Sequence, residues 1–157
     1  MQVQDRLSKL SQLLTAVGGQ VEGRKKLHKL VYLCQAAGIE LGQDFIFHYY
    51  GVYSPTLAAD VERGEKWEML KESQKSETYV IAATETADPE DDFSVAAKLA
   101  GESPRVLEVL STIVYLNDVG YSKNELPSKL NELKGHLNIE FSRAKTLARE
   151  NFDIHCA

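Results

Sequence analysis

The sequence predicts a mainly α-helical fold with a small β-hairpin. Apolar residues recur at helical spacing through most of the chain, and two Ser-Pro pairs mark helix starts. Only a few short runs are rich in aromatic and β-branched residues, as strands require. With 157 residues, the chain is long enough to bury one hydrophobic core. We therefore expect a single domain over residues 1–157.

Two helices are predicted before residue 40. The first spans Gln4–Val17, where leucines recur three and four residues apart and a glycine pair follows. The second spans Glu22–Ala37 and ends before Gly38. One face of this second helix is apolar, so the opposite face is expected at the surface. That opposite face carries Arg24, Lys25, His28 and Lys29.

An aromatic segment and a third helix follow. Phe45–Tyr50 is rich in aromatic and β-branched residues, which favours a short strand before a tight turn at Gly51. Ser54 is a typical N-cap and Pro55 then occupies the first helical position. We expect this third helix to end at Gly64.

A β-hairpin completes the N-terminal half. Trp67–Lys71 and Thr78–Thr84 can pair across residues 72–77. An order of helix, strand, helix and hairpin is typical of a winged helix-turn-helix, in which this hairpin would be the wing. Residues 1–84 are therefore predicted to form a winged-helix-like half. The acidic, turn-rich segment TETADPEDD joins it to a second half, residues 92–157.

The second half is predicted to consist of additional helices. A short helix is expected at Phe93–Ala100, and a Ser-Pro pair begins another over Arg105–Asn117. The latter is apolar around most of its circumference, which indicates a helix buried in the domain or covered by a partner. Ser122 and Glu125 fit a capping box for the next helix. The last helix has an apolar stripe made of Leu137, Phe141, Ala144 and Ala148.

The same spacing predicts a core and an interface. A homodimer through the C-terminal helices is expected, because winged-helix-like proteins often pair through helices outside the wing. The residues expected to be buried together are Leu27, Leu30, Val31, Leu57, Val61, Leu110, Ile113 and Val114.

The net charge of −5 is unevenly distributed. Residues 1–38 hold six Lys/Arg and two Asp/Glu, which gives +4, whereas residues 39–100 hold five and thirteen, which gives −8. The overall acidity argues against nonspecific binding to nucleic acid, but a local basic face remains on the second helix.

Two clusters are candidates for binding. Arg24, Lys25, Lys26 and Lys29 could bind an anionic partner, either a phosphate or an acidic protein surface, or could be a solvated helix face. Aromatic rings around the predicted turn could stack on bases or anchor a partner, or could alternate between core and surface along a strand. This second cluster consists of Phe47, His48, Tyr49, Tyr50 and Tyr53.

Motifs for catalysis, metal binding and cofactor binding are absent from the sequence. No P-loop, Gly-x-Ser-x-Gly or Rossmann glycine pattern occurs, and the four histidines lack metal-ligand spacing. A nuclease built on Asp44, Asp60 and Glu62 around Mg²⁺ is the least supported alternative, because their spacing matches no motif. Cys34 and Cys156 form no motif, and no signal peptide or membrane span is visible, so we expect a cytoplasmic protein.

Several segments together resemble a known family. GRKKLHKLVYLCQ, DFIFHYYGVYSPTLAADVE and STIVYLND resemble the YwgA-like bacterial proteins, whose function is unassigned. The family pattern has Pro where this chain has Val52. More distantly, the K-L-x-K-L-x-Y helix and the Y-G-x-Y-S turn are similar to the SocA-like antitoxin domain, also called Panacea. That resemblance implies a regulatory, protein-binding role beside toxins or proteolytic adaptors.

The sequence therefore favours a non-enzymatic regulatory or adaptor protein, antitoxin-like, that binds a protein partner. The alternative is a sequence-specific DNA-binding regulator, suggested by the winged-helix order and the basic second helix. The third helix argues against DNA, because Asp60, Glu62 and Glu65 would face phosphates. The expected partner contacts are Arg24, Lys25, Lys29, Tyr50 and Tyr53.

Overall fold

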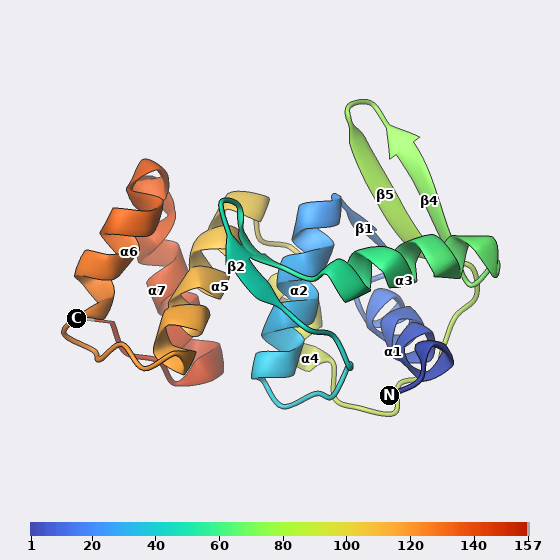
Figure 1. Cartoon of the computed structure of the whole chain (residues 1–157), viewed down its shortest axis with the longest axis horizontal. Helices are drawn as coiled ribbons and strands as arrows, with labels where there is room; N and C mark the ends of the chain where they lie inside the picture. The colour runs from blue at the N-terminus through green and yellow to red at the C-terminus, as the bar shows by residue number, and fades with distance from the viewer. Residues whose placement is uncertain (157) are drawn as a thin grey trace.

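Helices make up most of residues 1–156, the part of the chain that the computed structural model describes (Figure 1). Ala157, which falls in the predicted second half, lies outside the described residues. None of the described helices is both long and apolar enough to cross a membrane. The elements in chain order are α1 Val3–Ala16, β1 Gln20–Glu22, α2 Arg24–Ala36, β2 Ile46–His48, β3 Gly51–Tyr53, α3 Pro55–Lys66, β4 Leu70–Lys75, β5 Thr78–Ala83, α4 Ser94–Leu99, α5 Pro104–Asp118, α6 Leu126–Lys134, the 3-10 helix η1 Gly135–Glu140, and α7 Phe141–Phe152.

The strands form two small antiparallel sheets. The predicted hairpin is β4–β5, and β1 adds to it so that the strand order is β1-β5-β4. In this register Val21 lies opposite Ile81, and Ser73 lies opposite Val80. Strand β1 was not predicted from the sequence, because three residues are too few to show alternation. The hairpin projects from the body of the molecule (Figure 1).

The second sheet corrects the predicted single strand at Phe45–Tyr50. This segment forms a hairpin, in which β2 pairs with β3 and the turn consists of Tyr49 and Tyr50. Phe47 lies opposite Val52 in this ladder. After this two-residue turn the ladder resumes at Gly51, which pairs with His48. The φ of Gly51 is 93°, in the left-handed region that glycine tolerates.

The predicted core is confirmed. All eight residues expected to be buried together belong to one buried cluster, to which α1, α2 and α5 contribute most of the leucines. Helix α5 packs against α2 on one side and against α7 on another (Figure 1). Leu110 and Ile113 of α5 are completely buried. The chain itself therefore covers the helix that is apolar nearly all round.

The two helix starts predicted from Ser-Pro pairs are confirmed. The Ser54 side chain accepts a hydrogen bond from the Leu57 N–H at 3.0 Å, and the Ser103 side chain accepts one at 3.2 Å. Ser122 and Glu125 form the predicted reciprocal bonds, but these close a turn before α6 instead of capping it. The apolar stripe expected of one last helix is divided between η1 and α7.

Gly64 does not end the third helix, as the sequence analysis expected. Helix α3 continues to Lys66, and Gly64 lies buried where α3 crosses the Leu70 side chain. A Cβ at this position would stand 2.7 Å from Leu70 Cδ1 and 3.0 Å from Leu7 Cδ2. Glycine is required here by close packing and not by a helix stop.

Candidate functional site

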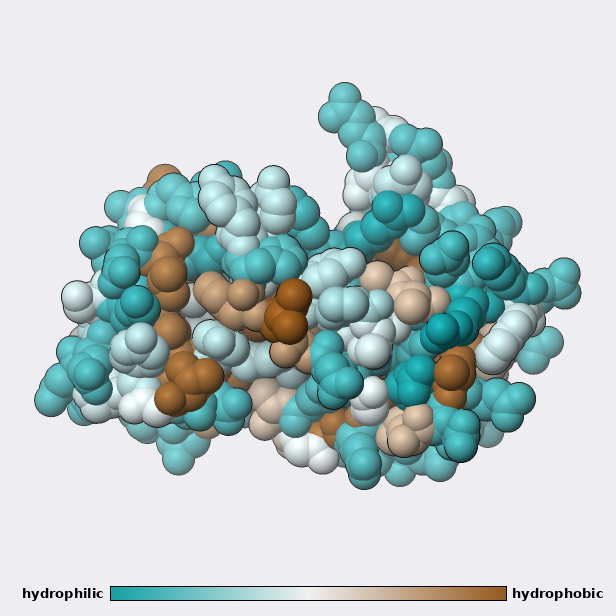
Figure 2. Space-filling view, viewed as in Figure 1, coloured by the Kyte–Doolittle hydropathy of each residue, from teal (hydrophilic) through white to brown (hydrophobic). Residues whose placement is uncertain are grey.

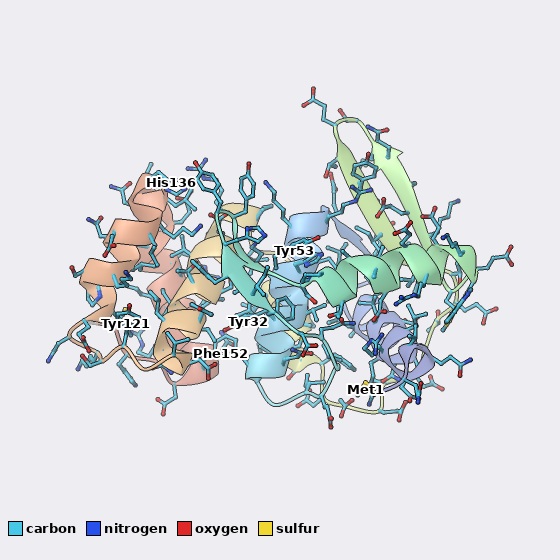
Figure 3. The ribbon with its side chains drawn as sticks, viewed as in Figure 1. Met1, Tyr32, Tyr53, Tyr121, His136 and Phe152 are labelled. Carbon is cyan, nitrogen blue, oxygen red and sulfur yellow. The ribbon has the colours of Figure 1, made fainter. Side chains whose placement is uncertain are left out.

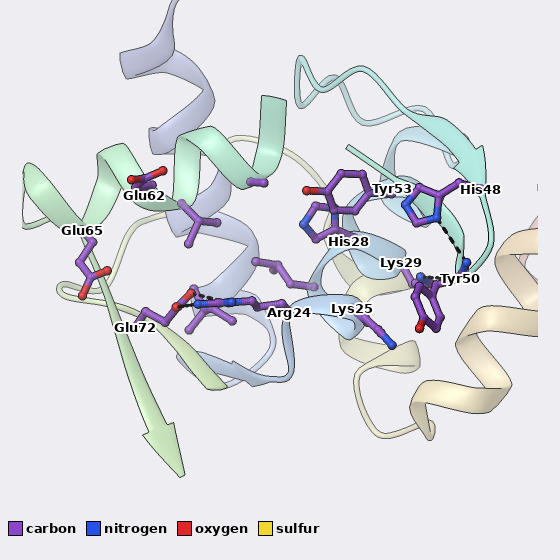
Figure 4. A pocket seen from close by; sticks show the side chains of 14 residues that line it. Arg24, Lys25, His28, Lys29, His48, Tyr50, Tyr53, Glu62, Glu65 and Glu72 are labelled. Carbon is purple, nitrogen blue, oxygen red and sulfur yellow. Dashed lines mark hydrogen bonds and ion pairs between the residues drawn. The ribbon is translucent and has the colours of Figure 1, made fainter. Parts of the chain in front are cut away.

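A cleft of about 550 Å³ lies between the two β-hairpins. Its walls are the first turns of α2, the β2–β3 hairpin, helix α3 and the base of the β4–β5 hairpin (Figure 4). On the space-filling surface, the molecule is hollowed beside the projecting β4–β5 hairpin (Figure 2). We call this feature the hairpin cleft. Its lining side chains come from Arg24, Lys25, Leu27, His28, Lys29, His48, Tyr50, Tyr53, Ala58, Val61, Glu62, Glu65, Glu72 and Ile81.

The five residues predicted as partner contacts all line this cleft. Arg24, Lys25 and Lys29 come from α2, whereas Tyr50 and Tyr53 come from the β2–β3 hairpin. The two groups meet because the hairpin folds back over the first turns of α2 (Figure 3). Their surroundings, however, differ from one residue to the next.

Lys29 corrects the prediction that this face of the second helix is exposed. Only 3% of Lys29 is accessible, and its Nζ donates hydrogen bonds to the carbonyl oxygens of Tyr50 at 2.9 Å and Val52 at 3.3 Å. Burial lowers the pKa of the Lys29 ammonium to about 8, although the nearby Glu108 carboxylate raises it. Lys29 therefore holds the hairpin from beneath instead of presenting a charge to solvent.

His28 is also buried, against the same prediction. The Ser54 N–H donates to His28 Nδ1 at 3.1 Å, and the imidazole stacks parallel to the Tyr53 ring at 4.7 Å between centroids. Burial lowers the pKa of His28 to about 4, and the charge of Lys29 adds to this effect. His28 is therefore neutral at pH 7, with a defined orientation in the wall of the cleft.

Arg24 and Lys25 are exposed, but neither is an isolated cation. Arg24 forms hydrogen bonds with the Glu72 carboxylate and lies 3.7 Å above the centroid of the Tyr79 ring. The Lys25 ammonium lies 3.7 Å from the centroid of the Tyr50 ring. The predicted basic face is thus divided, with one cation paired, one buried and one resting on an aromatic ring.

Helix α3 supplies the acidic side of the cleft. Glu62 and Glu65 are exposed and form no ion pair with another described residue. Asp60 does not share this face, because it is completely buried and accepts hydrogen bonds from Arg6 at 2.7 Å and from Gln43 at 2.9 Å. The earlier expectation that Asp60 lies on an acidic outer surface is therefore wrong. Among residues 1–156, no group of three or more His, Cys, Asp or Glu side chains is placed to hold a metal ion.

A second buried lysine supports the hairpin, and the sequence analysis did not identify it. Lys134 at the end of α6 is 2% accessible, and its Nζ donates to the Tyr49 carbonyl oxygen at 3.2 Å and to Glu108 at 2.9 Å. These partners lie 85 and 26 residues away along the chain, so no spacing rule could reveal them. The tip of the hairpin is therefore anchored from two helices.

None of the five residues of the aromatic cluster belongs to the buried core: Phe47 and Tyr53 are half-buried, and His48, Tyr49 and Tyr50 are exposed. Phe47 stacks on Tyr115 of α5 at 4.6 Å between centroids, and Phe45 packs edge-on against Tyr32. Tyr49 would follow them inward in a continuous strand, but it lies in the turn and is 86% exposed. Tyr50 beside it is 48% exposed.

Comparisons with known proteins give limited information about function. No family model matches the chain. The chain is similar to the uncharacterized protein YwgA of Bacillus subtilis (strain 168), with 28% identity over 142 residues that cover 80% of this chain and 84% of the relative. This similarity supports the resemblance to a YwgA-like family of unassigned function.

Proposed function

We propose that this chain is a non-enzymatic regulatory or adaptor protein that binds a protein partner in the hairpin cleft. The observation that carries the proposal is the combination of features in one concave surface. The exposed Tyr50 and the half-buried Tyr53 form one rim, charges of both signs form the walls, and apolar side chains also line the cleft. Protein interfaces are enriched in tyrosine and commonly place an apolar centre inside a polar rim.

An anchored hairpin also supports binding. Lys29 and Lys134 together bind the carbonyl oxygens of Tyr49, Tyr50 and Val52, so the tyrosine side chains project from a supported backbone. A preorganised binding surface loses less conformational entropy when a partner binds. The antitoxin-like role implied by the SocA-like resemblance is one form that such an adaptor could take, and it stays a prediction.

The test is affinity capture from the source cell with three forms of the protein. The wild type and Ile139→Ala should retain the same partner, because Ile139 is 86% exposed and does not line the cleft. Tyr50→Ala should lose it, since this substitution removes a tyrosine from the rim and leaves the carbonyl that Lys29 binds. Equal capture by all three forms, or capture of nothing in repeated experiments, would contradict the proposal.

Sequence-specific DNA binding is a second candidate, favoured by topology. If the β2–β3 hairpin between α2 and α3 is set aside as an insertion, the order α1, β1, α2, α3, β4, β5 with a β1-β5-β4 sheet is the arrangement expected of a winged helix, and α3 would then be the recognition helix. The carboxylates of Glu62, Glu65 and Glu72 on the cleft side weaken this candidate. Gel shifts across genomic fragments at two salt concentrations would decide, because binding through phosphates must weaken as salt rises.

A homodimer through the C-terminal helices also remains a proposal. Because α5 is covered within the chain, an interface would have to use outward residues of this half, such as Val119 and Ile139. Sedimentation equilibrium that shows only a 17.5 kDa species at high micromolar concentration would exclude it.

A further inference from the structure

The hairpin cleft is lined by a hydrogen-bond donor that has no protein partner among residues 1–156. His28 is 5% accessible and lines the cleft. Because the Ser54 N–H donates to Nδ1, that nitrogen must carry the lone pair, and the proton of the neutral ring is on Nε2. No acceptor for this Nε2–H is found among residues 1–156. Among residues 1–156, the fully buried side-chain atoms without a partner are Gln43 Oε1 and Glu140 Oε2, so His28 Nε2 is open to water or to a ligand in the cleft.

The opposite wall of the cleft carries unpaired negative charge. Glu62 and Glu65, one helical turn apart on α3, have no cationic partner in the described chain. Arg24 could have neutralised them, but it is bound to Glu72 on β4 (Figure 4). Lys25 lies over the Tyr50 ring on the far side of the cleft.

Apolar side chains lie between these two walls. Leu27 of α2 and Ala58 and Val61 of α3 line the cleft between the His28 side and the Glu62 side. From one wall to the other, the cleft therefore offers a neutral donor, an apolar strip and two carboxylates. Arginine and lysine have the matching sequence of groups, since an apolar stem separates the backbone from a cationic head.

We propose that the hairpin cleft receives one arginine or lysine side chain of the partner protein. The partner's backbone carbonyl accepts the hydrogen bond of His28 Nε2–H, and the aliphatic stem lies on Leu27 and Val61. The cationic head lies between Glu62 and Glu65. This inference rests on the proposed function only in assigning the side chain to a protein partner. The basic second helix suggested an anionic partner, whereas this inference assigns a cationic side chain to the cleft.

Phosphate-rich ligands fit the cleft less well. Glu62 and Glu65 would repel a phosphate, and Arg24 is already satisfied by Glu72. Of the three α2 cations that line the cleft, only Lys25 is exposed and unpaired with a carboxylate in residues 1–156. One such cation resting on a tyrosine ring does not outweigh two carboxylates at similar exposure.

The test uses four acetylated, amidated tripeptides, Gly-X-Gly, with arginine, lysine, glutamate or norleucine as X. Each is titrated into the ¹⁵N-labelled full chain and followed by NMR, including the His28 Nε2 resonance. The arginine and lysine peptides should shift cleft resonances and His28 Nε2 in a saturable way. The glutamate peptide should not, and the norleucine peptide should bind at least about fivefold more weakly. Equal responses to all four peptides, or none to the basic peptides, would overturn the inference.

Two variants separate recognition from general electrostatics. The double variant Glu62→Gln/Glu65→Gln should weaken arginine-peptide binding about five- to tenfold, since it removes two partly exposed charge contacts. Glu85→Gln lowers the acidity of an exposed segment outside the cleft and should leave the affinity unchanged. An equal loss in both variants would overturn the inference.

The two proposals fail in different ways. If a protein is captured through Tyr50 but the basic peptides do not bind, the arginine or lysine inference is wrong and the adaptor function stands. If the basic peptides bind as expected but no protein is captured, the chemistry of the cleft stands and the adaptor function is wrong.

Discussion

At the scale of single residues, the polar side chains of α2 determine how the cleft is built. His28 and Lys29 follow each other on what the sequence shows as a polar helix face, yet both are covered by the β2–β3 hairpin. Lys29 then donates to backbone carbonyls of that hairpin, and His28 accepts from the Ser54 N–H directly after it. Residue type and helical spacing could identify the face, but its burial depends on a contact between segments about 20 residues apart.

The buried imidazole predicts a pH dependence of stability. The folded-state pKa of His28 is about 4, below its ordinary 6.5, so between these values the unfolded chain binds a proton that the folded chain rejects. The contribution of His28 to stability is therefore complete above pH 6.5 and is lost as pH falls toward 4. Relative to His28→Gln, the wild type should lose about 2–3 kcal/mol of unfolding free energy between pH 7 and pH 4.5. Urea denaturation at both pH values measures this difference, and parallel pH profiles would contradict it.

Replacing Lys134 should destabilise the protein more than replacing Lys129, another lysine of α6. Lys134→Met should lower the unfolding free energy by about 3 kcal/mol, because it leaves the Glu108 carboxylate and the Tyr49 carbonyl without their donor. Lys129→Met removes a pair with the exposed Glu132 and a 5.9 Å contact with the Tyr121 ring, and should change stability by less than about 0.5 kcal/mol. Urea denaturation of both variants tests the contrast, and similar values for the two would show that the Lys134 pair does not anchor the hairpin.

At the scale of elements, the capping and turn residues predicted which helices form better than how far each helix extends. Ser54 and Ser103 begin α3 and α5 where expected, because an N-cap is a local interaction. Gly64 was misread as a helix end, since glycine serves both as a helix stop and as a site of close packing. Only the neighbouring Leu70 side chain distinguishes the two roles.

The role of Gly64 can be measured by substitution. Gly64→Ala should lower the unfolding free energy by about 1–2 kcal/mol, because overpacking against buried Leu70 outweighs the gain in helix propensity. Gly101→Ala is the control, since a methyl group there meets no atom within 4 Å. Thermal or urea denaturation that shows Gly64→Ala to be as stable as the control would mean that α3 can shift away from β4 at little cost.

At the scale of the whole molecule, periodicity predicted the core and the mainly helical fold. A helix buries its apolar face in whatever tertiary arrangement it adopts. Leu30 and Leu110 could therefore be assigned to the core from helical spacing alone. The cleft could be predicted only in part. The five residues predicted as partner contacts line it, but His28, Glu62 and Glu72 enter it through pairings between distant segments that no local pattern encodes.

The single-domain prediction has a direct test at this scale. Trp67, the one tryptophan, lies in the N-terminal half, whereas helical circular dichroism reports on both halves. Because α5 packs on α2, the two signals should follow one urea transition, and Leu110→Ala should lower stability by about 2–5 kcal/mol in both. A tryptophan transition that Leu110→Ala leaves unchanged would show that the halves unfold separately.

Photo-crosslinking in the source cell tests most directly whether the cleft binds a protein. A benzophenone side chain is introduced at Tyr50, on the rim of the cleft, or at Ile139, which is more exposed and outside it. The account predicts a discrete protein adduct from position 50 that is absent from position 139. Adducts of the same proteins from both positions, or an adduct from position 50 that contains nucleic acid and no second protein, would contradict it.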